Sequence, residues 1–133
     1  QRCVSSPDQK STQKKVERWQ KISVEAAKQC GRGILPPVSP LTDFSVALRQ
    51  SVSESTVLFF YEGGGQSLQQ CIDPSCKAYS IFIGPEGGFS EEEVQFALDL
   101  GAKKATLGPR ILRTETAPVA ALAAIMLTTG NMT

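Results

Sequence analysis

Residues 79–90 read YSIFIGPEGGFS and contain a transition from strand to turn to helix. Their first five residues are apolar or aromatic apart from one serine, which is typical of a strand buried on both faces of a sheet. The glycine-rich turn GPEGG ends this strand. Ser90 and Glu93 have the spacing of a capping box, and Gly101 predicts the end of the helix that follows. The stretch therefore predicts a strand–turn–helix unit.

The same kind of pattern recurs on both sides of this unit. Residues 56–61 (TVLFFY) and 105–107 predict two further strands, and helices are expected over 14–30, 43–50 and 115–128. Strands that alternate with helices predict an α/β fold with a mainly parallel sheet and helices on both of its faces. The last helix is apolar all round, so it must be buried on all sides or covered by another subunit.

Composition removes several classes of function. The 133 residues include no histidine, which excludes Ser-His-Asp hydrolases, Cys-His proteases and histidine-ligated zinc sites within the chain. No apolar run approaches the roughly 18 residues that a membrane-spanning helix requires. The four cysteines match neither a zinc pattern nor a dense disulfide scaffold. Cys71 and Cys76 could in principle form a bridge, but we favour reduced thiols, with Cys30, Cys71 and Cys76 structural, and expect no metal.

Charge is distributed unevenly although the net charge is only +1. Residues 1–33 carry eight basic and three acidic side chains, and the remainder carries six basic and ten acidic ones. One face of the expected 14–30 helix and the residues after it carries Lys14, Arg18, Lys21, Lys28 and Arg32. Two interpretations of this stripe remain, a solvated helix face or a surface that contacts the RNA backbone.

Three glycine-rich turns follow the three expected strands, at 62–65, 84–88 and 108–110. Because the carboxyl ends of parallel strands lie at one edge of a sheet, we expect these turns to form a ligand pocket. The glycine-rich stretches at 62–65 and 84–88 match neither a phosphate-binding nor a dinucleotide-binding motif. Each also contains a carboxylate, Glu62 or Glu86, which would repel a pyrophosphate. A cationic nucleoside such as S-adenosylmethionine suits them better. The alternative is that the glycines only permit tight turns.

Two long motifs make the pattern recognisable, IGPEGGFS at 83–90 and LGPRILRTETA at 107–117. With ERWQKI at 17–22 and EAAKQCGR at 25–32, they closely resemble the ribosomal RNA small subunit methyltransferase E family, which belongs to the SPOUT class of knotted methyltransferases. The resemblance implies methylation of N3 of a uridine in small-subunit ribosomal RNA, with S-adenosylmethionine as the donor. It also implies a C-terminal deep trefoil knot and a homodimer.

The resemblance further implies how the chain is organised. Residues 1–133 would form one SPOUT methyltransferase domain without its first strand and helix, and the family's N-terminal PUA-like RNA-binding domain would precede them. The implied location is a bacterial cytoplasm, or a plastid or mitochondrion. Two alternative functions remain, a SPOUT methyltransferase for another RNA target such as a ribose 2′-hydroxyl, and a non-catalytic knotted RNA-binding module.

Site residues follow from the family motifs. Methylation of uracil N3 develops negative charge on the ring, so the catalytic candidates are Arg110, Arg113, Thr114 and Glu115, with Arg113 favoured as the inward-facing arginine. Alternatively, Arg113 pairs with Glu115 or Glu86, and Thr114 caps the last helix. The cofactor contacts implied by the resemblance are Phe60, Tyr61, Glu62, Ile83, Gly84, Pro85, Glu86, Gly87, Gly88, Leu107, Gly108, Ile111, Leu112, Arg113 and Thr114.

Overall fold

The computed structural model describes residues 9–61, 64–73 and 75–132, which fall into two compact units, one that ends at Asp43 and one that begins at Phe44. The first unit contains helix α1 (Gln9–Cys30), which begins five residues earlier than the sequence predicts. Gln20 and Ser23 of α1 both donate to the carbonyl of Pro36, at 3.2 and 2.8 Å, so the segment after the helix is bound to it. No helix in the described ranges is both long and apolar enough to cross a membrane.

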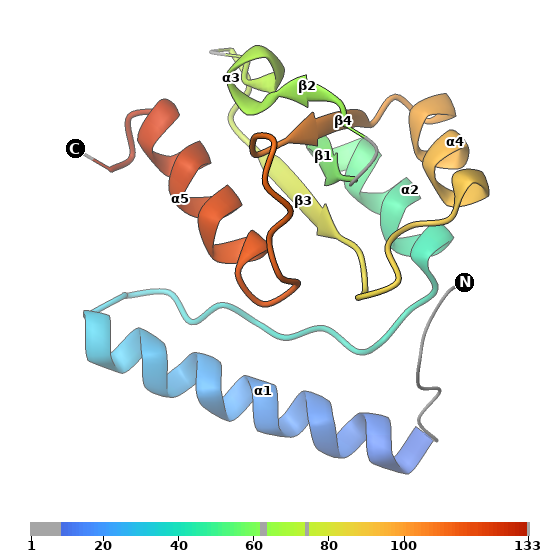
Figure 1. Cartoon of the computed structure of the whole chain (residues 1–133). Coiled ribbons are helices and arrows are strands. Elements are labelled where there is room, and N and C mark those ends of the chain that lie inside the picture. The colour runs from blue at the N-terminus through green and yellow to red at the C-terminus, as the bar shows by residue number, and fades with distance from the viewer. Residues whose placement is uncertain (1–8, 62–63, 74, 133) are drawn as a thin grey trace. The chain divides into compact units, whose positions relative to one another are not determined.

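The second unit is built on four parallel strands, β1 (Thr56–Phe60), β2 (Gln66–Ser67), β3 (Tyr79–Ile83) and β4 (Lys103–Thr106). Their order is β2-β4-β1-β3 (Figure 1). Strand β1 is paired on both sides, with Phe60 opposite Ile83 of β3 and Ala105 of β4. The three predicted strands are present, although β4 begins two residues earlier than expected. The two-residue β2 was not predicted.

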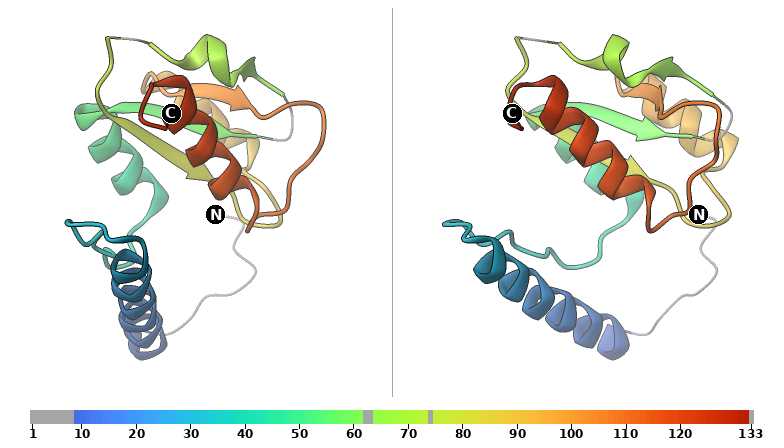
Figure 2. Two further views of the ribbon diagram at one scale, coloured as in Figure 1. Left: turned by 90° about the vertical axis from the view of Figure 1, so that its left-hand side faces the viewer. Right: turned by 60° about the vertical axis from the view of Figure 1, so that its left-hand side comes forward.

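Helices cover both faces of this sheet, which confirms the predicted layering (Figure 2). One face packs Val57 and Phe59 against α2 (Phe44–Glu54) and α4 (Glu91–Asp99). The other packs Leu58 against α3 (Leu68–Cys71) and α5 (Ala117–Thr128). The alternation of side chains along β1 therefore supplies both cores, and the sheet holds the carboxyl ends of its strands at one edge.

Capping agrees with the sequence at α4 and differs at α5. Ser90 accepts from the Glu93 amide at 3.1 Å, and the Glu93 carboxylate accepts from the Ser90 amide at 2.8 Å. Helix α5 begins at Ala117, and not at residue 115 with Thr114 as its cap. The helix begins later because Pro118 lacks an amide hydrogen and is accommodated only in the first turn of a helix.

Helix α5 buries only part of its apolar surface within the described structure. Ala117, Ala121 and Ile125 are buried, whereas Val119 and Leu127 are 69% and 66% exposed. The sequence predicts that this helix is covered all round. The described residues cover one side of it and leave a large apolar face open.

Candidate cofactor-binding site

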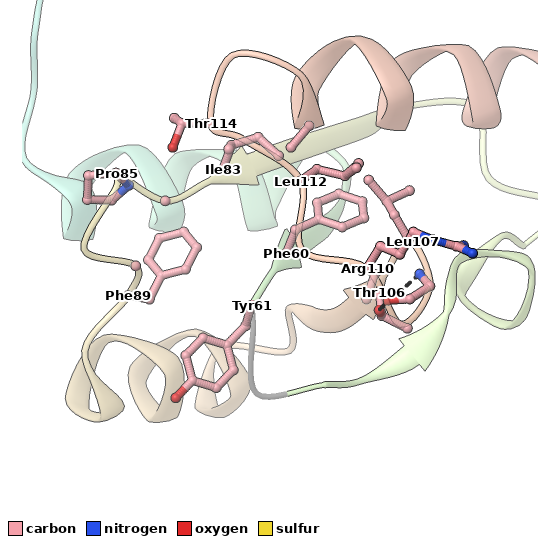
Figure 3. Close-up of a pocket in the computed structure, with 15 residues that line it drawn as sticks. Phe60, Tyr61, Ile83, Pro85, Phe89, Thr106, Leu107, Arg110, Leu112 and Thr114 are labelled. Atoms are coloured by element: carbon pink, nitrogen blue, oxygen red, sulfur yellow. Dashed lines mark hydrogen bonds between the residues drawn. The ribbon is translucent and has the colours of Figure 1, made fainter.

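A hollow lies where β1, β3 and β4 end, and it contains about 630 Å³ of free space, part of it open to solvent (Figure 3). The segments after the three strands and the start of α5 supply its wall. The lining consists of Phe60, Tyr61, Ile83, Gly84, Pro85, Gly88, Phe89, Ala105, Thr106, Leu107, Gly108, Arg110, Leu112, Thr114 and Ala117.

The turn after β3 needs its glycines for two separate reasons. The Gly88 amide donates to the Pro85 carbonyl at 2.7 Å, and Gly88 has a φ of 73°, which other residues rarely adopt. A Cβ on Gly84 would lie 3.3 Å from the ring of Phe89, so a side chain there would press on the wall of the hollow. The turn therefore combines a tight bend with a close approach of the backbone to the wall.

The loop after β4 is ordered by hydrogen bonds at both ends. The Thr106 hydroxyl accepts from the Gly108 amide at 3.2 Å and donates to the Gly108 carbonyl at 3.0 Å. At the other end, the Arg113 carbonyl accepts from the amides of Thr116 and Ala117, each at 2.9 Å. These contacts fix a short loop between β4 and α5, and residues 110, 112 and 114 of that loop line the hollow.

Most of the predicted cofactor contacts lie on this wall. The structure brings together Phe60, Tyr61, Ile83, Gly84, Pro85, Gly88, Leu107, Gly108, Leu112 and Thr114. Glu86, Gly87, Ile111 and Arg113 are exposed and do not line it. Glu62 lies outside the described residues. Arg110 is the only charged side chain in the described lining, so the acidic lining expected from Glu86 is not found there.

The catalytic candidates divide in the same way. Arg110 and Thr114 line the hollow, whereas Arg113 and Glu115 are exposed outside it. The sequence favours Arg113 as the inward-facing arginine, but the structure brings Arg110 to the wall. Within the described ranges, Arg113 makes no ion pair with Glu86 or Glu115. The catalytic role of each of these residues stays a prediction.

Sequence reasoning omitted four residues that line the hollow, Phe89, Ala105, Thr106 and Ala117. Each lies inside or beside a motif already identified. Phe89 directly precedes Ser90, the N-cap of α4, and it is buried. Its ring lies 6.0 Å from that of Phe59 at 90°. Its position directly after the GPEGG turn was the signal in the sequence that Phe89 could also line the hollow.

Neither Cys71 nor Cys76 lines this hollow. Cys71 is buried, and burial raises its pKa above the ordinary thiol value. Cys76 lies 2.9 Å from the hydroxyl of Thr56, at the opposite end of β1, and this hydrogen bond is the main cause that lowers the pKa of Cys76. Cys30, Cys71 and Cys76 are all free thiols. The described residues contain no group of three or more His, Cys, Asp or Glu side chains suited to a metal ion.

A hollow at the carboxyl ends of parallel strands, walled by glycine turns, is the arrangement of an α/β enzyme that binds a cofactor. Residues 1–126 match the RNA methyltransferase domain family, and the chain belongs to this family. It is 38% identical over 131 residues to the ribosomal RNA small subunit methyltransferase E of Bacillus subtilis, with 93% of this chain and 51% of that protein covered. The Buchnera aphidicola enzyme of the same name is 34% identical over 118 residues, with 88% of this chain and 46% of that protein covered.

Solved structures give the same relationship. A ribosomal RNA small subunit methyltransferase E from Neisseria gonorrhoeae, bound to S-adenosylmethionine, has a TM-score of 0.88 and 40% identity over all of this chain and 54% of its own. A Legionella pneumophila protein in complex with the same cofactor has a TM-score of 0.81 and 32% identity, over 96% of this chain and 52% of that one. The chain spans about half the length of the curated relatives it matches.

Proposed function

We propose that this chain is the catalytic part of an S-adenosylmethionine-dependent methyltransferase that acts on N3 of a uridine in small-subunit ribosomal RNA. One observation carries the proposal. The segments after three parallel strands line one hollow, and they include the two motifs that resemble the family. The S-adenosylmethionine bound in two related structures supports the choice of cofactor.

The residues on the wall fit such a cofactor. Phe60, Ile83, Leu107 and Leu112 supply apolar surface for an adenine ring, and the glycine turns let the backbone approach a ribose closely. S-adenosylmethionine, when bound, supplies an activated methyl group. The chain's contribution is to hold donor and acceptor in line and to exclude water around them.

Transfer to N3 replaces the N3–H bond of uracil with an N3–CH3 bond, so the ring must lose its N3 proton. Negative charge then spreads over N3 and the neighbouring carbonyl oxygens. Arg110, an exposed cation in the lining of the hollow, can stabilise this charge, and the Thr114 hydroxyl lies on the same wall to hydrogen-bond the base. Arg113 is the second candidate, from the exposed part of the same loop.

Two surfaces fit the proposed partners. The predicted RNA-binding side chains Lys14, Arg18, Lys21, Lys28 and Arg32 are all exposed, as phosphate contacts must be. The open apolar face of α5, which includes Val119 and Leu127, suits a second copy of the chain. This face supports a homodimer, which we include in the proposal. The proposal also includes the knot, which the family resemblance implies.

Calorimetric titration with S-adenosylmethionine, followed by mass-spectrometric mapping of the methylated nucleotide in small-subunit RNA, tests the proposal. Binding and a methyl group on uridine N3 are expected. A methyl group on a ribose 2′-oxygen would replace the uridine assignment, and RNA binding without cofactor binding would identify a non-catalytic module. Arg110→Ala should abolish methylation and leave cofactor binding measurable, and unchanged methylation would remove Arg110 from the mechanism.

A further inference from the structure

The two aromatic residues at the end of β1 lie on opposite faces of the sheet. Phe60 packs with the core that contains Leu58 and α5, whereas Tyr61 packs with the core that contains Phe59 and α4. Figure 3 shows their rings pointing to different sides of the strand end. Both residues line the hollow, so its wall has a Phe60 side and a Tyr61 side.

Lys104 of β4 belongs to the Tyr61 side. It is paired with Phe59 in the register of the sheet, and its ammonium lies 5.6 Å from the centroid of the Tyr61 ring. That distance is typical of a cation–π contact. The adjacent Lys103 lies on the opposite face, where its ammonium donates to the Cys71 carbonyl at 3.4 Å. Two consecutive lysines therefore have different environments.

The backbone of Gly65 packs closely against Lys104. A Cβ on Gly65 would come within 2.6 Å of the Lys104 carbonyl oxygen and 3.1 Å of its Cγ, so only glycine permits this approach. In the described part of the chain, the Lys104 ammonium has no carboxylate partner and the Tyr61 hydroxyl has no hydrogen bond. Lys104 is thus a half-buried cation beside Tyr61, with no anionic partner among the described residues.

We propose that Lys104, positioned by the ring of Tyr61, binds a backbone phosphate of the RNA next to the nucleotide that enters the hollow. This inference rests on the proposed function and adds a contact for the acceptor strand. A polyanion suits the site because the Lys104 ammonium is the only charge in the contact between Lys104 and Tyr61. Phe60 and Leu107, which we propose to contact the adenine ring, pack on the opposite face of the sheet from Tyr61, so Lys104 is placed to serve the other reactant.

Lys104→Met tests the inference, because methionine keeps the apolar stem and removes the charge. Lys103→Met is the matched control on the opposite face, and Lys104→Arg should restore the cation. RNA affinity is measured as a function of salt, KM and kcat are measured with small-subunit RNA, and cofactor affinity is measured by calorimetry. Thermal unfolding of each variant checks that it is folded.

Lys104→Met should weaken RNA binding about fivefold and reduce the slope of log affinity against log salt by about 0.7–0.9, the value for one phosphate contact. KM for RNA should rise by a similar factor, with kcat and cofactor affinity unchanged. Equal effects of Lys104→Met and Lys103→Met, or a loss confined to cofactor affinity, would overturn the inference. Failure of the wild type to bind S-adenosylmethionine would refute the proposed function instead, and the RNA-binding measurement would still decide the role of Lys104.

Discussion

The ring of Phe89 links the core of the second unit to the wall of the hollow, and replacing it with leucine should reveal that link. Phe89 is only 7% exposed. Its ring centroid lies 5.5 Å from that of Phe44 and 6.0 Å from that of Phe59. Aromatic pairs of this geometry contribute about 0.5–1.5 kcal/mol each beyond the burial of their area. Phe89→Leu removes two pairs and should lower the free energy of unfolding by roughly 1–3 kcal/mol.

A double-mutant cycle isolates one of these pairs. The variants Phe89→Leu, Phe59→Leu and the double variant are unfolded with urea and followed by circular dichroism, and their coupling energy should be about 0.5–1.5 kcal/mol. Phe60 is the matched control because it lines the same hollow and makes no ring pair with Phe89 among the described residues. The Phe60–Phe89 cycle should therefore give a coupling close to zero.

Two results would refute this reasoning. A Phe59–Phe89 coupling no larger than that of Phe60–Phe89 would show that the ring pair adds nothing beyond burial. A Phe89→Leu variant with unchanged stability would show that its ring is not part of the core. Cofactor titration of the same variants then separates stability from binding, since Phe89 lines the hollow and Phe59 does not.

Three further changes have distinct expected results. Ser90→Ala removes the acceptor for the Glu93 amide and should cost about 0.5–2 kcal/mol of stability in urea unfolding, so an unchanged midpoint would contradict the observed cap. Gly88→Ala meets no atom within 4 Å but forces alanine to a φ of 73°, so the same assay should show a loss of about 1–2 kcal/mol from the backbone alone. Thr56→Val removes the hydroxyl that lowers the pKa of Cys76, so the pKa should rise and alkylation by iodoacetamide at neutral pH should slow. Peptide mass spectrometry follows the rate, and an unchanged rate would exclude the hydroxyl as the cause.

The sequence by itself determined the elements whose signals are local. The strand at 79–83, the capping box at Ser90 and the glycine turn after the strand depend on neighbouring residues, and the structure confirms them. The expected burial of this strand on both faces is wrong, because β3 is an edge strand of the sheet and its residues are only half-buried. The parallel α/β layering followed from the alternation of these elements. Placing the turns at one edge of the sheet followed from strand direction alone, which is why most of the residues predicted as cofactor contacts lie on the wall of one hollow.

Only the tertiary structure decided which side chains face the hollow. Arg110 and Arg113 lie three residues apart in one loop, and the hydrogen bonds that order this loop at each end, together with the start of α5, leave Arg110 at the wall and Arg113 outside it. Lys104 meets Tyr61 because β4 pairs with β1, a contact between residues 43 positions apart in the chain. Local pattern does not encode such pairings, since they arise only when distant segments exclude water from a shared core.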